Sequence, residues 1–284
     1  IIKEDSVELK NDLKIYWNSF PIGYLIAGKD YLNPDIKLII DDMIESSDQK
    51  EIYKYLISWI NKKIKEELNN LIELKNIESP NSLIRGLAYR IYENNGIVKR
   101  EEVKNFVTKL NQDERKILRT KGVKFGRYHI FLYKLFKPKA VSLRTLLWKN
   151  FNQKYFDLEP PQFGLNFIGG NKKLNQEFML ICGFEKFENY YVRIDILERL
   201  FLIMIDPKKN INKEIKLIPE MLNLLGCNKE NFIKLMEKMN YKSLLKGKEI
   251  YFKYLSNKRY KKITTTKLVN KDNPFSVLKE IRIK

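Results

Sequence analysis

A thirty-residue amphipathic pattern, from residue 46 to residue 75, constrains the fold of this chain more than any other feature. Apolar side chains recur there at the i, i+3, i+4 and i+7 spacing of one helix face, and lysines and glutamates alternate on the opposite face. Ser46 followed by Gln49 predicts a capping box at the helix start. We interpret this helix as a structural strut whose buried stripe is formed by Ile52, Tyr55, Leu56, Trp59, Ile60, Ile64, Leu68, Leu71 and Ile72.

Composition favours a helical globular protein. The 284 residues include only 12 glycines and 9 prolines, and 44% of them are hydrophobic. The expected fold is mainly α with small β-hairpins, built as a helical accessory domain plus a winged-helix-like module. The expected divisions are a small β element at 1–45, which could end a preceding domain, a helical domain with a basic central motif at 46–158, the winged-helix-like module at 159–262 and a basic C-terminal tail at 263–284.

Two helix starts carry local signals. Asn111 with Glu114 predicts a capping box for a short helix. Pro138 suits the first turn of a later helix, because its missing N–H has no partner to lose there. On that later helix Arg144 and Lys149 fall off the apolar stripe, so both are expected to reach solvent.

The winged-helix prediction depends on the order of elements near the end of the chain. Residues 219–225 and 229–239 have helical patterns separated by a tight turn, and 241–255 read as two strands. Helix, turn, helix and hairpin is the order of a winged helix. Such a module could bind nucleic acid or serve only for packing and protein contacts.

Positive charge is gathered in two blocks, although acidic residues are frequent elsewhere. The net charge is +19; residues 115–154 contribute +12 without one acidic residue, and 241–284 contribute +10. Residues 127–135 are rich in β-branched and aromatic side chains and are expected to be extended. A polyanion is the simplest partner for such blocks. Alternatively, several of the aromatic residues could belong to the hydrophobic core, and some of the lysines could serve only to keep the protein soluble. The predicted nucleic-acid contacts are Arg115, Lys116, Arg119, Lys121, Lys124, Arg127, Tyr128, His129, Lys134, Lys137, Lys139, Arg144, Lys234, Lys246 and Lys248.

The sequence contains no self-contained active site. It lacks the phosphate-binding loop G-x-x-x-x-G-K-[ST], a G-x-G-x-x-G turn after a strand, and the H-E-x-x-H and G-x-S-x-G motifs. A catalytic dyad would have to use His129, the one histidine, which is expected to be packed or to contact phosphate. Since Cys182 and Cys227 are the only cysteines, no Cys/His zinc cluster is expected, and neither is any other metal or cofactor.

Three segments of the central block resemble a known family: residues 122–132 (GVKFGRYHIFL), 135–140 (LFKPKA) and 143–148 (LRTLLW). Together they resemble the C-terminal region of bacterial superfamily 2 helicases related to the mitochondrial degradosome RNA helicase. Weaker matches follow in the same order at 85–89, 192–200, 224–227 and 273–280. The resemblance implies that two RecA-like motor domains precede Ile1 in a longer parent protein. The binding of ATP and Mg²⁺ and the unwinding activity would belong to that parent protein, and no catalytic residue is carried over to this chain.

These features predict a nucleic-acid-binding accessory region of an ATP-dependent helicase, a monomer that holds RNA or single-stranded DNA beside the motor. One alternative is a protein-docking module that recruits a nuclease or another partner through its basic surface. A second alternative is a stand-alone enzyme that uses His129. No stretch is apolar enough for a membrane span and no signal peptide begins the chain, so the expected location is the cytoplasm of a bacterium rather than a mitochondrion.

Overall fold

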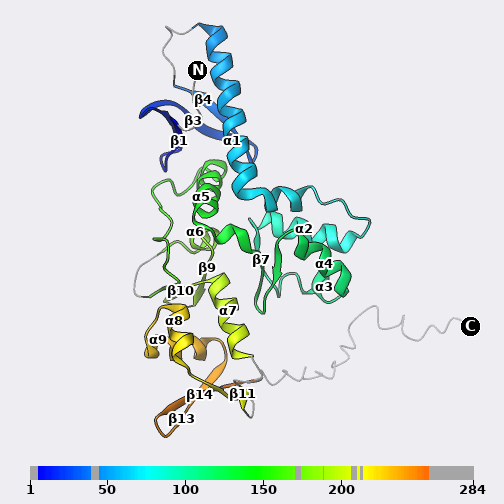
Figure 1. Cartoon of the computed structure of the whole chain (residues 1–284), viewed down its shortest axis with the longest axis vertical. Coiled ribbons are helices and arrows are strands. Elements are labelled where there is room, and N and C mark those ends of the chain that lie inside the picture. The colour runs from blue at the N-terminus through cyan, green and yellow to red at the C-terminus, as the bar shows by residue number, and fades with distance from the viewer. Residues whose placement is uncertain are drawn as a thin grey trace, which may run out of the picture.

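The computed structural model describes residues 6–39, 45–169, 174–187, 189–205, 210–211 and 214–255. Its elements form tiers along one long axis (Figure 1). The first tier is an antiparallel meander in the order β1-β2-β3-β4, on which the long helix α1 packs. These elements are β1 (Val7–Leu9), β2 (Lys14–Trp17), β3 (Phe20–Asp30), β4 (Asn33–Leu38) and α1 (Ser46–Lys75).

Helix α1 confirms the amphipathic pattern of residues 46–75. Its buried side chains include Leu56, Ile60 and Ile64, and it is kinked at Leu68, where φ is −118° and ψ is 19°. The capping box predicted at Ser46 is wrong, because Glu45 is the N-cap and no side chain caps the helix there.

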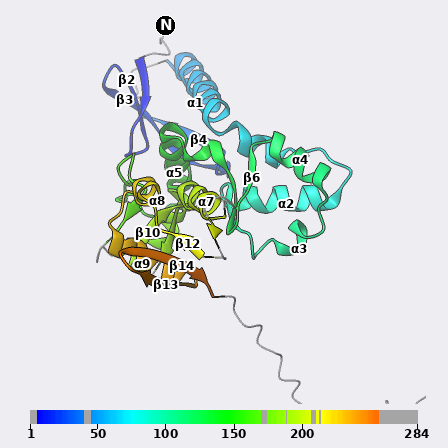
Figure 2. The same cartoon turned by 60° about the horizontal axis from the view of Figure 1, so that its bottom comes forward.

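The second tier is a three-stranded antiparallel sheet in the order β5-β7-β6. Helices α2, α3 and α4 stand together at one side of the molecule (Figure 2). The predicted capping box of Asn111 and Glu114 is present at the start of α4, and Pro138 occupies the first turn of α5. The elements are α2 (Ser82–Glu93), β5 (Ile97–Lys99), α3 (Lys104–Val107), α4 (Gln112–Thr120), β6 (Val123–Phe125), β7 (His129–Leu132), the 3₁₀ helix η2 (Tyr133–Phe136) and α5 (Pro138–Asn152).

One apolar core joins these two tiers. Ile15 of β2, Leu56 of α1, Leu87 of α2 and Leu147 of α5 are fully buried and belong to the same cluster. Helix α5 lies inside this core, in contact with α1 and β3, and has few positions that could face water.

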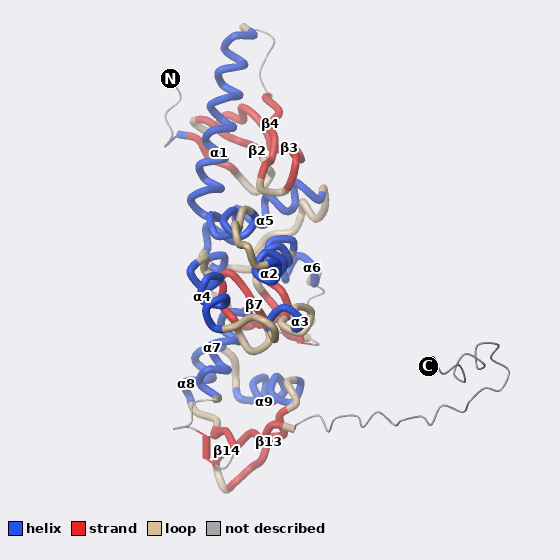
Figure 3. Tube along the Cα trace, turned by 90° about the vertical axis from the view of Figure 1, so that its right-hand side faces the viewer, coloured by secondary structure: helices blue, strands red, loops and turns tan. Residues whose placement is uncertain are grey.

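The remaining tiers carry two further antiparallel sheets, in the orders β8-β10-β9 and β11-β12-β14-β13. Figure 3 shows the β13–β14 strands at the end of the molecule opposite to β2–β4. Helix α7 joins the sheets β8-β10-β9 and β11-β12-β14-β13, because Val192, Leu197 and Phe201 belong to the same apolar core as Phe232 and Phe252. The elements are β8 (Phe167–Ile168), α6 (Gln176–Ile181), β9 (Phe184–Phe187), β10 (Tyr190–Arg193), α7 (Ile194–Met204), β11 (Asn210–Ile211), β12 (Glu214–Lys216), α8 (Pro219–Leu225), α9 (Lys229–Lys238), β13 (Tyr241–Lys246) and β14 (Glu249–Tyr254).

The predicted fold class is wrong. The structure is mixed, with 47% helix, 25% strand and four small antiparallel sheets among the described residues, rather than mainly α with hairpins. The winged-helix-like assignment finds no support either: the β13–β14 hairpin forms one edge of a four-stranded sheet with β11 and β12. Strands of two or three residues, such as β8 and β12, leave no alternation long enough to recognise in a sequence. The predicted tail at 263–284 lies outside the described residues.

None of the described helices combines the length and the apolar character that crossing a lipid bilayer requires.

Candidate nucleic-acid interface

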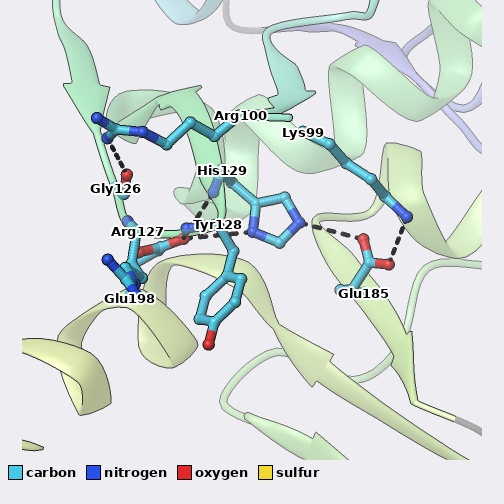
Figure 4. A network of polar contacts seen from close by, with 8 residues as sticks. All are labelled: Lys99, Arg100, Gly126, Arg127, Tyr128, His129, Glu185 and Glu198. Atoms are coloured by element: carbon cyan, nitrogen blue, oxygen red, sulfur yellow. Dashed lines mark hydrogen bonds and ion pairs between the residues drawn. The ribbon is translucent and has the colours of Figure 1, made fainter. Parts of the chain in front are cut away.

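The turn between β6 and β7 is held by a single buried carboxylate (Figure 4). Glu198 of α7 accepts hydrogen bonds from three successive backbone N–H groups, those of Arg127, Tyr128 (2.9 Å) and His129 (2.8 Å). Only glycine fits at the start of this turn, because a Cβ at Gly126 would lie 2.4 Å from Cδ of Glu198 and 2.7 Å from the carbonyl oxygen of His129. Helix α7 is therefore joined to the central sheet through the residues of this turn.

His129 lies between two carboxylates and is only 3% exposed (Figure 4). Its Nδ1 is 3.3 Å from Oε1 of Glu198, and its Nε2 is 3.1 Å from Oε2 of Glu185, which also pairs with Lys99 at 2.9 Å. Burial alone would lower the pKa of His129, but the hydrogen bonds to Glu185 and Glu198 outweigh it and raise that pKa above its ordinary value. Burial alone would raise the pKa of Glu185, but the hydrogen bonds from His129 and Lys99 outweigh it and lower that pKa below its ordinary value.

These pKa shifts predict how the stability of the fold depends on pH. The raised pKa of His129 adds stability that is complete below about pH 6.5 and is lost as pH rises through the folded-state pKa. The lowered pKa of Glu185 adds stability above about pH 4.5 that is lost as pH falls through its folded-state pKa. Urea unfolding of the wild type should therefore show a free energy of unfolding that declines above about pH 6.5. The difference between wild type and His129→Gln should shrink over the same range, and a constant difference would contradict the assignment.

A cleft of about 710 Å³ opens beside the β6–β7 turn. It lies between the segment that carries β5 and α3 and the C-terminal tier, and His129 is part of its lining. Four of its cations, Arg100, Lys104, Arg115 and Arg127, come from three segments of the chain, and no described carboxylate lies within ion-pair distance of them. Lys99 is paired with Glu185, and Glu101 is the other acidic residue of the lining, so the cleft is positively charged.

Two of these arginines are fixed by backbone carbonyl groups. Arg100 donates to the carbonyl oxygen of Gly126 at 2.7 Å, and Arg115 donates to that of Val107 at 2.7 Å. A guanidinium has five N–H donors, so each arginine keeps donors for a ligand. Nε of Arg115 is buried without a hydrogen-bond partner. Arg100 and Arg115 are thus held in place by neutral carbonyl groups, which do not compensate the positive charge of either side chain.

Aromatic side chains line the same cleft: Tyr128, Phe187 and Tyr254. The Tyr128 ring packs 4.5 Å from Phe201 of α7, and burial raises the pKa of its hydroxyl to about 12. Tyr254 stands at the end of β14, with its ring 5.1 Å from that of Tyr241, and is 44% exposed. Cations and rings of this kind, side by side in a cleft, suit a single-stranded nucleic acid.

The predicted contact residues are spread over several surfaces. Arg115, Arg127, Tyr128 and His129 meet at the cleft. Lys121 is paired with Glu73 and Lys246 with Glu214, so both charges are compensated. The others are exposed and lie on α4, β6, η2, the start of α5, α9 and the β13–β14 turn; they are Lys116, Arg119, Lys124, Lys134, Lys137, Lys139, Lys234 and Lys248.

The predicted solvent exposure of Arg144 and Lys149 is wrong, and with it the assignment of Arg144 as a phosphate contact. Arg144 is fully buried, donates to the carbonyl oxygens of Asn95 (3.0 Å) and Ile181 (2.6 Å), and has its pKa lowered by burial to about 10. Lys149 is 1% exposed and donates to the carbonyl oxygen of Leu158. Helix α5 contacts β3, α1 and α6, so the side opposite its apolar stripe is also covered.

Several residues of the cleft escaped the sequence analysis. Lys99, Arg100 and Lys104 stand beside two glutamates, so a local count of charge finds no excess there. Tyr254 reaches the cleft through the pairing of β14 with β12 and β13, which a local pattern does not show. Glu198 could have been recognised from the sequence. It follows Ile194 by four residues, so the helical period places this acidic residue on the buried face of α7.

Chemistry of other kinds finds little support in the described part of the chain. No group of three or more His, Cys, Asp or Glu side chains there could hold a metal ion. Cys182 and Cys227 are free thiols, and burial raises the pKa of Cys182 to about 12. No family model matches the chain, and no curated protein or solved structure matches it either.

Proposed function

We propose that this chain is a nucleic-acid-binding module, the C-terminal accessory region of an ATP-dependent helicase, and that it holds phosphates in the cleft beside the β6–β7 turn. One observation carries the proposal: Arg100, Lys104, Arg115 and Arg127 converge on one cleft without a carboxylate partner. Like charges brought together repel one another, and a chain of phosphates would relieve that repulsion while releasing its own counterions. The helicase context comes only from the resemblance of residues 122–148.

The exposed cations outside the cleft would extend the path of the strand. Lys124 lies 5.3 Å from the ring of Tyr133 and Arg119 lies 5.5 Å from that of Phe125, so two of these cations already stand over aromatic faces. Neither has an acidic partner among the described residues. With the four cleft cations they would give six phosphate contacts, enough for binding that depends strongly on salt.

A salt titration tests this function. Affinity of the wild type for a labelled single strand, followed by fluorescence anisotropy between about 50 and 200 mM salt, should fall with a log–log slope steeper than about −3, at ~0.7 per phosphate contact. The double variant Lys104→Gln/Arg127→Gln removes two cleft charges without a buried ion pair, so its slope should be shallower by about 1.4.

The matched control removes two charges elsewhere. Lys50 and Lys54 are exposed on the first turns of α1 and do not line the cleft, and their replacement by glutamine lowers the net charge equally. The slope of that control should equal the wild-type slope. A wild-type slope near zero, or equal changes in both double variants, would argue against specific phosphate contacts in the cleft.

The docking alternative has its own candidate surface. A second cleft of about 370 Å³, lined in part by Pro161, Phe163 and Leu165, presents apolar side chains, and Phe163 is 53% exposed. Exposed apolar side chains around a cleft are typical of a protein-binding site. A partner such as a nuclease seated there would stay bound when homopolymer RNA fills the basic cleft, whereas one bound through the basic surface would be displaced.

A further inference from the structure

The two walls of the basic cleft differ in chemistry. Arg100 and Lys104, which follow β5 and begin α3, supply cations from the second tier of the fold. Tyr254 of β14 supplies an aromatic ring from the C-terminal tier, and Arg127 and Tyr128 stand between them on the β6–β7 turn. A ligand that satisfies both walls must carry a phosphate and a flat apolar face within one short unit.

We infer that the cleft selects an unpaired nucleotide, with its phosphates on Arg100, Lys104 and Arg127 and its base stacked against Tyr254. This inference rests on the proposed nucleic-acid-binding function and adds the base-stacking residue and the selection against duplex. The ring of Tyr254 is available for stacking, because it lines the cleft and is 44% exposed, while a T-shaped contact with the buried Tyr241 holds it in place.

The size of the cleft also favours a single strand. A volume of about 710 Å³ falls within the range of small-ligand sites, about 300 to 1,000 Å³, so it has room for one or two nucleotides and not for a double helix. Bases within a duplex are stacked on their neighbours and cannot offer a face to Tyr254, whereas bases of a single strand can be splayed out onto an aromatic ring. Because every base has such a face, the site should tolerate any sequence.

The experiment replaces the stacking residue and changes the ligand. Tyr254→Ala should weaken binding of a short oligothymidylate by about 5- to 150-fold, the range for the loss of one stacked base, and Tyr254→Phe should restore it. Leu255→Ala is the matched control, since Leu255 is the next residue, is 52% exposed and does not line the cleft. An abasic strand of equal length keeps the phosphates, so it should bind wild type and Tyr254→Ala alike.

The outcomes separate the two proposals. If the wild type binds the strand with a steep salt dependence but Tyr254→Ala matches Leu255→Ala, the inference fails and the proposed function stands. Equal affinity for a blunt duplex and for the single strand would overturn the inference in the same way. If the wild type binds none of these ligands, both proposals fail. Selective loss of single-strand binding in Tyr254→Ala, with the abasic strand unaffected, supports the inference.

Discussion

Replacing Glu198 with alanine is expected to destabilise the folded chain by about 3 to 5 kcal/mol, the range for removing one partner from a buried charged network. The variant would strip the acceptor from three adjacent backbone N–H groups, at Arg127, Tyr128 and His129, and would also remove one of the two carboxylates beside the His129 ring. Each N–H group left buried and unpaired costs about 1 to 3 kcal/mol, and water that enters the turn would recover part of that cost.

Urea unfolding of three variants checks this expectation. Glu198→Gln keeps one carbonyl oxygen as an acceptor but turns an amide N–H₂ group toward backbone donors, so its loss should be smaller than that of Glu198→Ala. Arg199→Ala, on the exposed side of the same helix, should change the free energy of unfolding by no more than about 0.5 kcal/mol. If Glu198→Ala were as mild as Arg199→Ala, the carboxylate would not be holding the β6–β7 turn.

The same variant should also weaken binding of nucleic acid. The turn carries Arg127 and Tyr128 into the basic cleft, and Glu198 is the group that fixes its backbone. Loosening the turn leaves every cation in the chain, so the salt dependence should persist while affinity falls.

Most features set by neighbouring residues could be read from the sequence, although the capping box expected at Ser46 is absent. The amphipathic stripe of α1, the capping box at Asn111 and the position of Pro138 each depend on interactions within a few residues, and the structure has all three. The hairpin of β13 and β14 belongs to the same kind, because Gly247 provides the positive φ of 62° that its turn requires.

Features that depend on distant segments could not be read in this way. The four small sheets pair strands of two to eleven residues, and most of these strands are too short to show a period of two. Part of the cationic cleft is built from a segment that looks balanced in charge, since Lys99 and Arg100 precede Glu101 and Glu102. Convergence of charge in space is a property of the tertiary fold, so a count along the chain located only part of it.

Arg144 shows the opposite error, in which a count along the chain includes a charge that never reaches the surface. Its guanidinium spans two chain reversals, donating to the carbonyl oxygen of Ile181 at the end of α6 and to that of Asn95 after α2. Carbonyl groups at helix C-termini carry partial negative charge, so a cation is favoured there even without a carboxylate. Burial lowers the pKa of Arg144 to about 10, which still leaves it charged at neutral pH.

Replacing Arg144 with alanine is therefore expected to cost about 3 to 5 kcal/mol, because the loss combines a cavity with two unpaired carbonyl groups. Arg144→Met preserves most of the packing and should cost about 1 to 3 kcal/mol. Lys139→Ala, at the exposed start of the same helix, serves as the control and should stay within about 0.5 kcal/mol.

Binding measurements on Arg144→Met distinguish a structural arginine from a phosphate contact. A phosphate contact would lower the salt slope of single-strand binding by about 0.7 and leave the free energy of unfolding nearly unchanged. We expect the reverse: a clear loss of stability and an unchanged slope, because the guanidinium lies inside the core between α2, α5 and α6. An unchanged stability with a shallower slope would instead place Arg144 on the proposed nucleic-acid-binding surface.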